Sequence, residues 1–386
     1  MPHKPQSPEV PPKPEIKDLT PEQLAQWFQQ HGMRSFRVTQ VLKWIYLHQA
    51  ESFEEMSDLS KETRQHLTEN FSLERLKIEK KETSQDGSQK YLFRLRDGNL
   101  IESVLIPEKN HDTLCISSQV GCALGCRFCL TAQGGFIRNL TAGEIIAQVN
   151  DIKHATGLAG KLTNIVLMGM GEPLANYDNV INALRIITDG NAGLKISSRR
   201  VTLSTAGLVP YMARFGKDIQ VNLAVSLNAT DNKTRDWLMP INRTYPIEKL
   251  LEACASFPLP NRRKITFEYI LIKGINDTPE DAGRLAGLLR PIRAKINLIP
   301  FNSHAESPLA CPHEDVILRF QTILLDKGFT VIIRRSKGAD ISAACGQLRA
   351  RIQRPENRGQ RPEAREQRPE NRGRSVRSRE TAEGKR

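Results

Sequence analysis

Apolar positions recur at helical spacing between residues 16 and 76. A first helix is predicted from Thr20, a good N-cap with a proline in the next position. A second is predicted over residues 36–48, and Ser60 opens a third. The pattern therefore predicts a small helical domain over residues 16–76.

The next stretch, residues 77–112, alternates between apolar and polar positions at the period of a β-strand. Residues 91–96 and 100–106 alternate on either side of Asp97-Gly98, which is a turn signal. We expect a β-hairpin that links the helical domain to the rest of the chain.

From residue 113 onward, segments of strand character alternate with segments of helical period. The predicted strands are residues 113–118, 164–170, 199–205, 219–227, 264–273 and 295–300. The predicted helices are residues 141–156, 178–189, 209–215, 247–256, 279–290 and 314–327. Such alternation predicts an α/β domain with a parallel sheet. Six strand–helix units are fewer than the eight that close a barrel, so an open (β/α)6 partial barrel and a doubly wound sheet both fit.

Polar groups follow five of the predicted strands, at the edge where parallel α/β folds place their active sites. They are a cysteine-rich loop after the first strand, Gly169-Met-Gly-Glu-Pro173 after the second, Ser204 in the third, Ser226-Leu227-Asn228 in the fourth and Asn302 after the sixth. We expect Gly169 and Gly171 to let a ligand approach the backbone, and Glu172 to offer a carboxylate to an ammonium group.

The cysteine-rich loop holds three cysteines in a C-x3-C-x2-C spacing: Cys122, Cys126 and Cys129. Gly121 and Gly125 tolerate the positive φ that a tight wrap requires. Thiolates bind zinc or iron–sulfur clusters. A structural zinc site has four protein ligands, and His111 or Cys115 would be the nearest fourth. A cubane on three cysteines instead leaves one iron open to a small molecule.

Lysine and arginine number 56 against 43 aspartates and glutamates, for a net charge of +13. This excess favours a polyanionic partner such as RNA. Seven cysteines, several of them clustered, argue against a secreted disulfide framework. No apolar run is long enough to span a membrane, and we expect a cytoplasmic protein. Residues 1–15 are rich in proline and residues 351–386 repeat Arg-Pro-Glu, so both ends are predicted to be disordered.

At the cysteine loop the chain resembles a known superfamily. C-x3-C-x-aromatic-C, with Phe128 as the aromatic, is the signature of the radical S-adenosylmethionine (SAM) enzymes. The surrounding text, Cys115-Ile-Ser-Ser-Gln-Val-Gly and Thr131-Ala-Gln-Gly-Gly-Phe, resembles the bacterial RNA adenine carbon-2 methyltransferases of the RlmN type. The resemblance covers about residues 15–350. It implies a radical SAM partial barrel over residues 113–350, an N-terminal helix–hairpin–helix-like domain that docks RNA, a [4Fe-4S] cluster on the three cysteines and two SAM molecules per turnover.

The resemblance also implies roles for single residues. Cys345, within a stretch of small residues that suits a mobile loop, would take a methyl group from one SAM. A radical derived from a second SAM would activate that group for addition to adenine. Glu102 would remove the ring proton, and Cys115 would release the product through a transient disulfide. The implied SAM pocket consists of Gly171, Glu172, Ser204, Ser226, Leu227, Asn228 and Asn302. Asn228 replaces the histidine of many family members.

The implied substrates are an adenosine in the peptidyl-transferase centre of large-subunit rRNA and the adenosine 3′ of the anticodon in tRNA. We further expect a flavodoxin-like electron donor and a monomeric protein. Two alternatives stay open: methylation of adenosine at carbon 8 with the same cysteines, and a metal-stapled RNA-binding module without catalysis. The Thr131–Phe136 segment favours the carbon-2 type.

Overall fold

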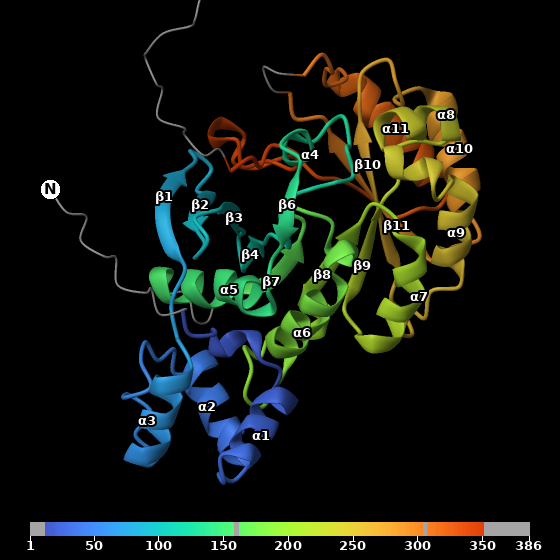
Figure 1. Ribbon diagram of the computed structural model, residues 1–386. Coiled ribbons are helices and arrows are strands. Elements are labelled where there is room, and N and C mark those ends of the chain that lie inside the picture. Colours follow the sequence, from blue (N-terminus) through green and yellow to red (C-terminus); the bar gives the residue numbers. More distant parts are fainter. Residues whose placement is uncertain (1–11, 158–161, 304–306, 351–386) are drawn as a thin grey trace, which may run out of the picture. The chain divides into compact units, whose positions relative to one another are not determined.

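The computed structural model describes residues 12–157, 162–303 and 307–350. Most of the predicted leader and the whole of the predicted tail lie outside these residues. A ten-stranded sheet runs through the described part in the order β1-β2-β3-β4-β7-β8-β9-β10-β11-β12 (Figure 1). Its strands are β1 (Lys77–Thr83), β2 (Gln89–Arg94), β3 (Leu100–Pro107), β4 (Asp112–Cys115), β7 (Leu162–Leu167), β8 (Val201–Thr205), β9 (Asn222–Ser226), β10 (Ile265–Leu271), β11 (Ala294–Pro300) and β12 (Val331–Ile333).

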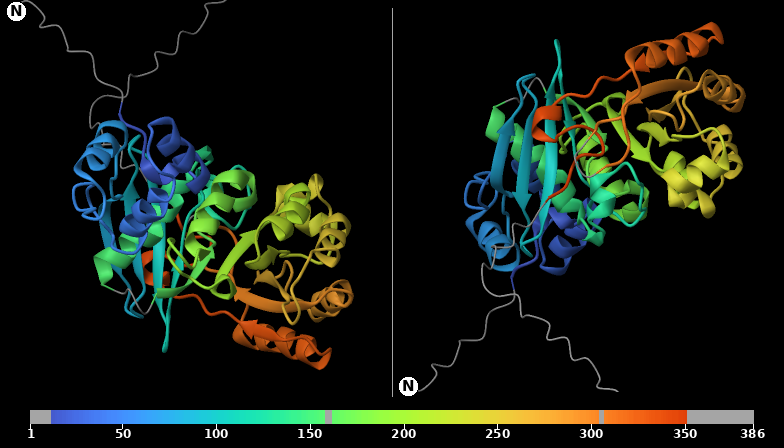
Figure 2. Two further views of the ribbon diagram at one scale, coloured as in Figure 1. Left: turned by 90° about the horizontal axis from the view of Figure 1, so that it is seen from below. Right: turned by 90° about the horizontal axis from the view of Figure 1, so that it is seen from above.

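Neighbouring strands from β4 to β12 are parallel, whereas β1 to β4 pair antiparallel. The six predicted strands of the α/β domain are therefore present as β4 and β7 to β11, and the α/β class is confirmed. The sheet is curved and open, with helices on its outer side (Figure 2). A doubly wound sheet would carry helices on both faces. The short strand β12 extends the parallel part beyond the prediction.

The helices are α1 (Pro21–Gln30), α2 (Arg37–Tyr46), α3 (Lys61–Asn70), α4 (Leu130–Gln133), α5 (Ala142–Thr156), α6 (Tyr177–Thr188), α7 (Val209–Asp218), α8 (Asn232–Leu238), α9 (Ile247–Ala255), α10 (Pro279–Leu289) and α11 (Glu314–Asp326). Several of the helices begin at a residue whose side chain caps them, among them α1, α3, α5, α8 and α10. Thr20, Thr141 and Thr278 each form a reciprocal capping box with the residue three positions on. Helices α4 and α8 were not predicted, nor was the small antiparallel pair β5 (Gln119–Gly121) and β6 (Phe136–Asn139).

Helices α1 to α3 form the predicted N-terminal helical domain, and polar contacts join this domain to α5. The backbone N–H of Gly143 donates to Asp18 Oδ1 (3.0 Å). A Cβ on Gly143 would lie 2.5 Å from that same oxygen, so only glycine permits the approach. Arg75 Nη1 lies 3.2 Å from Asp151 Oδ1, which is buried. These contacts anchor the helical domain beside the parallel sheet.

Strands β2 and β3 form the predicted hairpin, with Leu92 opposite Glu102. The hairpin continues the parallel sheet, because β3 pairs with β4 and brings Val104 opposite Cys115. The strands that contain Glu102 and Cys115, β3 and β4, are therefore neighbours in the sheet.

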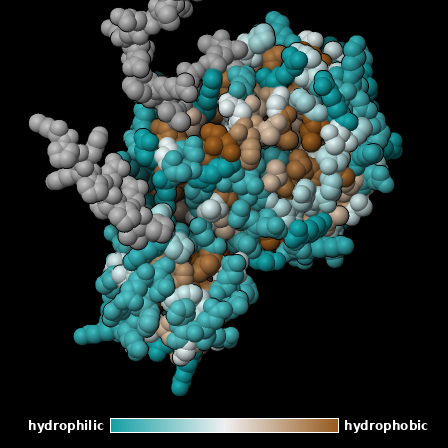
Figure 3. Space-filling model, in the orientation of Figure 1, coloured by the Kyte–Doolittle hydropathy of each residue, from teal (hydrophilic) through white to brown (hydrophobic). Residues whose placement is uncertain are grey.

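Hydrophilic residues cover most of the face drawn in Figure 3, with apolar residues in small groups between them. Within the described residues, no helix is both long and apolar enough to cross a membrane.

Candidate active site

The cysteine loop runs from β5 through α4 to β6. Gly121 has φ +76° and Gly125 has φ +67°, which confirms that both glycines adopt left-handed backbone. A Cβ on Gly121 would lie 1.9 Å from the carbonyl oxygen of Gly135. That oxygen accepts a hydrogen bond from the backbone N–H of Cys122 (2.9 Å). Glycine at position 121 therefore allows the loop to close against the strand that follows it.

Backbone hydrogen bonds hold the cysteine loop from two sides. Arg127 N donates to Leu238 O at the end of α8 (3.0 Å). Leu130 N donates to Gly346 O (2.7 Å). The second contact joins the cysteine loop to the C-terminal segment that contains Cys345.

A cavity of about 150 Å³ lies beside the cysteine loop, at the carboxyl ends of the parallel strands. We call it the thiol cavity. Most of the predicted site residues line it: Cys122, Cys126, Cys129, Gly171, Glu172, Ser204, Ser226 and Cys345. The fold thus brings together side chains from separate strands, the cysteine loop and the C-terminal segment.

Glu172 places a buried carboxylate in the lining of the thiol cavity. Its Oε1 accepts a hydrogen bond from Leu174 N (3.1 Å), and its Oε2 accepts one from Ala206 N (2.8 Å). Burial raises the pKa of Glu172 to about 7 in spite of these donors. A cationic group in the cavity would favour the ionised carboxylate.

Gly169 and Gly171 line the thiol cavity, and both are closely packed by the chain itself. A Cβ on Gly169 would lie 2.7 Å from Ile116 O, and one on Gly171 would lie 2.5 Å from Gln119 Cβ. Glycine is required here because the segment that leads into the cysteine loop packs directly against the end of β7. That these glycines also let a ligand approach the backbone stays a prediction.

Ser204 and Ser226 share one acceptor, a carboxylate that sequence reasoning missed. Ser204 Oγ donates to Glu268 Oε2 (2.8 Å), and Ser226 Oγ donates to the same oxygen (3.4 Å). Glu268 lies on β10, is buried and lines the thiol cavity. Its only sequence signal was an acidic residue inside an otherwise apolar strand.

The other predicted residues of the SAM pocket, Leu227, Asn228 and Asn302, are not part of the cavity lining. Asn228 has φ +58°, and its Oδ1 accepts a hydrogen bond from Ile270 N (2.9 Å). Asn302 Nδ2 donates to the carbonyl oxygen of Cys345 (3.1 Å). These amides position the end of β9 and the Cys345 segment, and their contact with SAM stays a prediction.

The segment around Cys345 is held at several points. Gly338 N donates to Asp86 Oδ2 (2.7 Å), which lies in the turn between β1 and β2. Farther along, Thr131 Oγ1 donates to Leu348 O (2.6 Å). In Figure 2 this red segment runs from β12 towards β1 and β2. The predicted mobility of the segment stays a prediction.

Cys115, at the end of β4, is buried and lies outside the lining of the thiol cavity. Burial raises the pKa of Cys115 to about 12, and the neighbouring Cys345 contributes in the same direction. Cys115 is therefore a protonated thiol at neutral pH. A disulfide between Cys115 and Cys345 stays a prediction.

Glu102 is buried on β3, and both of its carboxylate oxygens have partners. Oε1 lies 3.3 Å from Lys90 Nζ, and Oε2 accepts a hydrogen bond from Arg349 N (2.7 Å). Burial raises the pKa of Glu102, while Lys90 and the Arg349 N–H act in the opposite direction. Glu102 therefore contacts the chain four residues after Cys345.

Comparisons with known proteins identify the family of this chain. Residues 15–73 match the family described as "Ribosomal RNA large subunit methyltransferase N-terminal domain", and residues 116–286 match the radical SAM superfamily. The chain is 59% identical over 340 residues to "Dual-specificity RNA methyltransferase RlmN" of Desulfosudis oleivorans. The alignment covers 88% of this chain and 92% of the relative. The chain belongs to the RlmN family of dual-specificity RNA methyltransferases.

Other members of the RlmN family are nearly as similar. The protein of the same name from Geobacter sulfurreducens is 54% identical and aligns with 88% of this chain and 92% of its own length. A crystal structure of a radical SAM methyltransferase from Sphaerobacter thermophilus superposes with a TM-score of 0.82 at 42% identity, over 88% of this chain and 100% of that one. The radical SAM fold with an N-terminal helical domain is therefore shown.

Membership of the RlmN family, within the radical SAM superfamily, implies a [4Fe-4S] cluster and SAM. The residues fit such a group, because three thiols line one cavity that also contains a buried carboxylate. In the described ranges, no three His, Cys, Asp or Glu side chains converge as the ligands of a single metal ion would. The C-x3-C-x2-C sequence and the match to the radical SAM superfamily favour a cluster over the zinc alternative.

Proposed function

We propose that this chain methylates carbon 2 of adenosine in RNA, in the peptidyl-transferase centre of large-subunit rRNA and 3′ of the anticodon in tRNA. One observation carries the proposal: Cys345 lines the same cavity as Cys122, Cys126 and Cys129. A methyl carrier and a radical-generating centre must share one site if both act on the same methyl group. The names of the relatives support RNA as the substrate.

Cys122, Cys126 and Cys129 would hold the cluster. Burial raises the pKa of all three thiols, so binding of iron must displace their protons. When bound, the cluster and SAM supply the methyl group and the one-electron chemistry that activates it. Every other step falls to side chains of this chain.

Two carboxylates of the thiol cavity would orient SAM. Glu172 would bind the ammonium group, since its carboxylate is buried and faces the cavity. Glu268 offers acceptor oxygens for ribose hydroxyl groups, in the place where it now accepts from Ser204 and Ser226. These contacts fix both ends of one small molecule.

Cys345 would carry the methyl group. Carbon 2 of adenine is not nucleophilic, so it cannot take a methyl group from SAM by simple displacement. The thiol of Cys345 instead loses its proton, its sulfur forms a bond to the methyl carbon, and S-adenosylhomocysteine leaves. Asn302 and Leu130 hold the backbone on either side of the sulfur through Cys345 O and Gly346 O.

Glu102 would accept the proton from the ring carbon after the new carbon–carbon bond has formed, and the unpaired electron that radical addition leaves on the ring would pass to a one-electron acceptor. A raised pKa suits a carboxylate to this task. Cys115 would then attack the sulfur of Cys345. An S–S bond forms, the bond from Cys345 sulfur to the transferred carbon breaks, and its electron pair stays on that carbon, which takes up a proton. A thiol reductant must reduce the disulfide before the next turnover.

A small flavodoxin-like protein is the expected one-electron donor, and we expect the chain to act as a monomer in the cytoplasm. Neither expectation affects the chemistry at the thiol cavity.

The test is an anaerobic assay with the reconstituted protein. Iron and sulfide are added, followed by reductant, SAM and an RNA fragment of the peptidyl-transferase centre, and the nucleosides are identified by mass spectrometry. We expect 2-methyladenosine from the wild type and from Cys311→Ser, a matched variant of an exposed cysteine. Cys345→Ala should form none, although it still cleaves SAM.

Two outcomes would contradict the proposal. Formation of 8-methyladenosine would keep the carrier and move the reaction to the other carbon. Cleavage of SAM without any methylated RNA would leave a radical SAM enzyme with a different substrate.

A further inference from the structure

A second and larger cavity, of about 510 Å³, lies at the amino-terminal ends of the same parallel strands. Polar residues from the amino-terminal part or the middle of each strand line it: Thr113, Asn164, Thr202, Asn222, Thr266, Lys295 and Asn297. The thiol cavity is lined instead by residues at the strands' carboxyl ends, such as Ser204, Ser226 and Glu268. The two cavities thus occupy opposite ends of the strands.

The two cavities meet at Cys345. Met168, Ile299 and Cys345 line both of them. A carrier thiol needs access to the methyl donor and to the methyl acceptor. Because the donor side is the thiol cavity, the second cavity is the other approach to the same sulfur.

Positive charge distinguishes this second cavity, which we call the basic cavity. Its cationic lining residues are Arg199, Arg200, Lys295, Arg334, Arg335 and Lys337, and its one acidic lining residue among the described side chains is Glu108. Arg335 pairs with Glu314, Lys337 pairs with Glu108, and Arg334 lies 3.9 Å from Glu268 Oε1. The remaining cations exceed the available carboxylates, so the cavity attracts anions.

Arg199, Arg200 and Lys295 are the cations best placed for an external anion. No ion pair involves any of them in the part of the chain that the structure describes, and both arginines are exposed. The arginines lie in the short turn Ser198–Arg200 that leads into β8. They therefore stand at the mouth of the cavity, whereas Cys345 is at its inner end.

The neutral part of the lining suits a nucleoside. Asn164, Asn222 and Asn297 offer amide groups, which can both donate to and accept from the edges of a base. The volume also falls within the range of small-molecule sites, roughly 300–1,000 Å³. An unstacked adenosine with its flanking phosphates combines a polar base with negative charge. The cavity complements both features, with amide groups for the base and cations for the phosphates.

We propose that the basic cavity admits the target adenosine of the RNA, with Arg199 and Arg200 on the flanking phosphates. The RNA then reaches Cys345 from the amino-terminal end of the strands, while SAM reaches it from the carboxyl end. The proposal rests on the proposed function, in that it takes RNA as the substrate. Extrusion of the nucleotide from its stack is required for any chemistry on the base.

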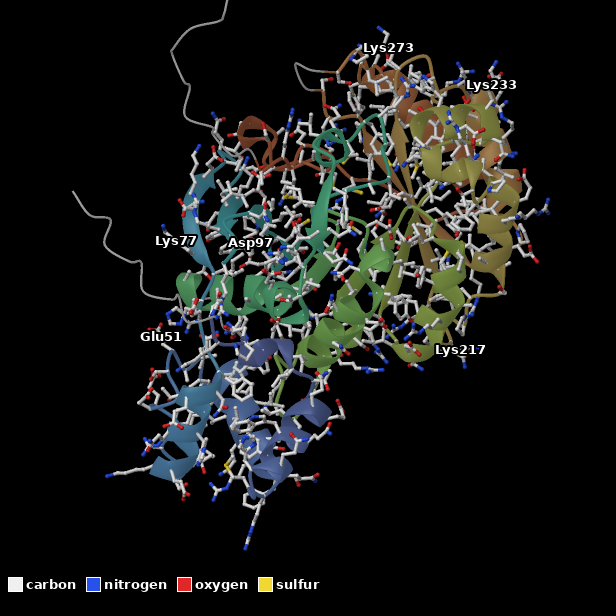
Figure 4. All side chains as sticks on the ribbon, in the orientation of Figure 1. Glu51, Lys77, Asp97, Lys217, Lys233 and Lys273 are labelled. Atoms are coloured by element: carbon white, nitrogen blue, oxygen red, sulfur yellow. The ribbon has the colours of Figure 1, made fainter. Side chains whose placement is uncertain are left out.

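The test compares two double variants that remove equal charge. Arg199→Gln/Arg200→Gln changes the mouth of the basic cavity. Lys233→Gln/Lys249→Gln changes exposed lysines on the outer helices α8 and α9, and Figure 4 shows Lys233 at the outer surface there. RNA affinity of the reconstituted protein is measured from 50 to 300 mM KCl, a range of about sixfold in salt. Methylation of Cys345 by SAM alone, followed by peptide mass spectrometry, shows whether the thiol cavity is intact.

We expect the arginine variant to bind RNA about tenfold more weakly or worse, and its salt slope to fall by about two. Methylation of Cys345 without RNA should match the wild type. The lysine variant should resemble the wild type in every measurement. Equal RNA affinity and equal salt slope for the two variants would overturn the inference.

A plug tests the cavity itself rather than its charge. Thr202→Trp fills the basic cavity from β8, and Thr322→Trp places the same side chain on the exposed side of α11. We expect RNA methylation by Thr202→Trp to fall about 100-fold, since small misplacement of reacting groups has effects of that size, with Cys345 still methylated by SAM. Full RNA methylation by a folded Thr202→Trp protein would overturn the inference. Absence of methyladenosine from the wild type would instead refute the proposed function, which keeps the two failures distinct.

Discussion

The two cavities on either side of Cys345 differ in the sign of their charge. No lysine or arginine is among the described residues of the thiol cavity, whose charged groups are the carboxylates of Glu172 and Glu268. The basic cavity has six lysines and arginines and the single carboxylate of Glu108. SAM is a sulfonium cation with an ammonium group, and RNA is a polyanion. Opposite charges at the two ends of the strands therefore sort two substrates that must meet at one sulfur.

The difference also shows why the carrier residue is on a C-terminal segment rather than on a strand. Most strand residues line one cavity or the other according to their position along the strand, as Thr202 and Ser204 do on β8, and Ile299 on β11 lines both. Cys345 crosses between the cavities because its segment lies across the sheet, fixed to Asn302 and to the cysteine loop. We expect the cavities to respond to substitution independently, apart from changes in this segment.

The largest expected effect is the loss of the chemistry at the thiol cavity while RNA binding at the basic cavity is unchanged. Cys126→Ala takes away a cluster ligand, and we expect SAM cleavage and RNA methylation to fall to background. RNA affinity should stay within about twofold of the wild type, because distant sites act independently to within a few tenths of a kcal/mol. The measurements are 5′-deoxyadenosine formation and RNA affinity of the same preparation. A parallel loss of RNA affinity would show that the two cavities are not separate sites.

The parallel strands could be predicted from sequence, because hydrophobic periodicity locates them. The polar edge at their carboxyl ends follows from that placement. The prediction missed elements that depend on tertiary contacts rather than on a local sequence pattern. Helix α8 has seven residues, and its Arg235 is fully buried, with hydrogen bonds to the carbonyl oxygens of Leu227 (3.0 Å) and Ala206 (2.8 Å). A buried arginine without a carboxylate looks like a surface residue in sequence. Strand β12 is three residues long and has no pattern of its own.

The site was predictable where a local motif carried it and less so where contacts span the chain. The cysteine loop, Glu172 and Cys345 stand in recognisable segments. Glu268 pairs with Ser204 across 64 residues, and Glu102 contacts Arg349 across 247. Sequence spacing contains no information about such contacts. The basic cavity was missed for the same reason, because each parallel strand contributes only one to three of its residues.

The next largest expected effect concerns the charge of Glu172 in the thiol cavity. Burial raises the pKa of Glu172 to about 7 from its ordinary 4.5. Without ligand, the folded protein therefore binds this proton more tightly than the unfolded chain, and stability falls as pH rises from about 4.5 to about 7. SAM affinity has the opposite sign. It should rise with pH up to about 7 and level off above, since only the ionised carboxylate attracts the ammonium group.

Glu172→Gln should lower SAM affinity about tenfold at pH 8, as expected for loss of a charge-assisted hydrogen bond. Its affinity should no longer change between pH 6 and 8. RNA affinity at the basic cavity should not change at either pH. Calorimetric titration of the reconstituted protein with SAM measures the first two quantities. A Glu172→Gln protein that keeps the wild-type pH dependence would assign the titration to another group.

The smallest effect should touch both cavities at once, because it acts on the segment that they share. Asp340 fastens the Cys345 segment to the turn between β1 and β2: its Oδ1 accepts from Ser84 Oγ (2.5 Å), and its Oδ2 accepts from Gln85 N (3.1 Å). Asp340→Ala removes both hydrogen bonds. We expect the rate of RNA methylation to fall about threefold, in keeping with the modest net value of exposed hydrogen bonds, and the amides of residues 338–346 to exchange faster with solvent.

Asp189→Ala is the matched control, since Asp189 also accepts two hydrogen bonds, in its case from the backbone N–H groups of Asn191 (2.9 Å) and Ala192 (3.0 Å) in a turn after α6. It should leave exchange in residues 338–346 unchanged. The informative quantity is the pattern within Asp340→Ala. If the substitution loosens the Cys345 segment, methyl transfer from SAM to Cys345 and transfer onward to RNA should both become slower. Slowing of only one of these steps would mean that the segment belongs functionally to a single cavity, and the thiol of Cys345 would then have to move between donor and acceptor.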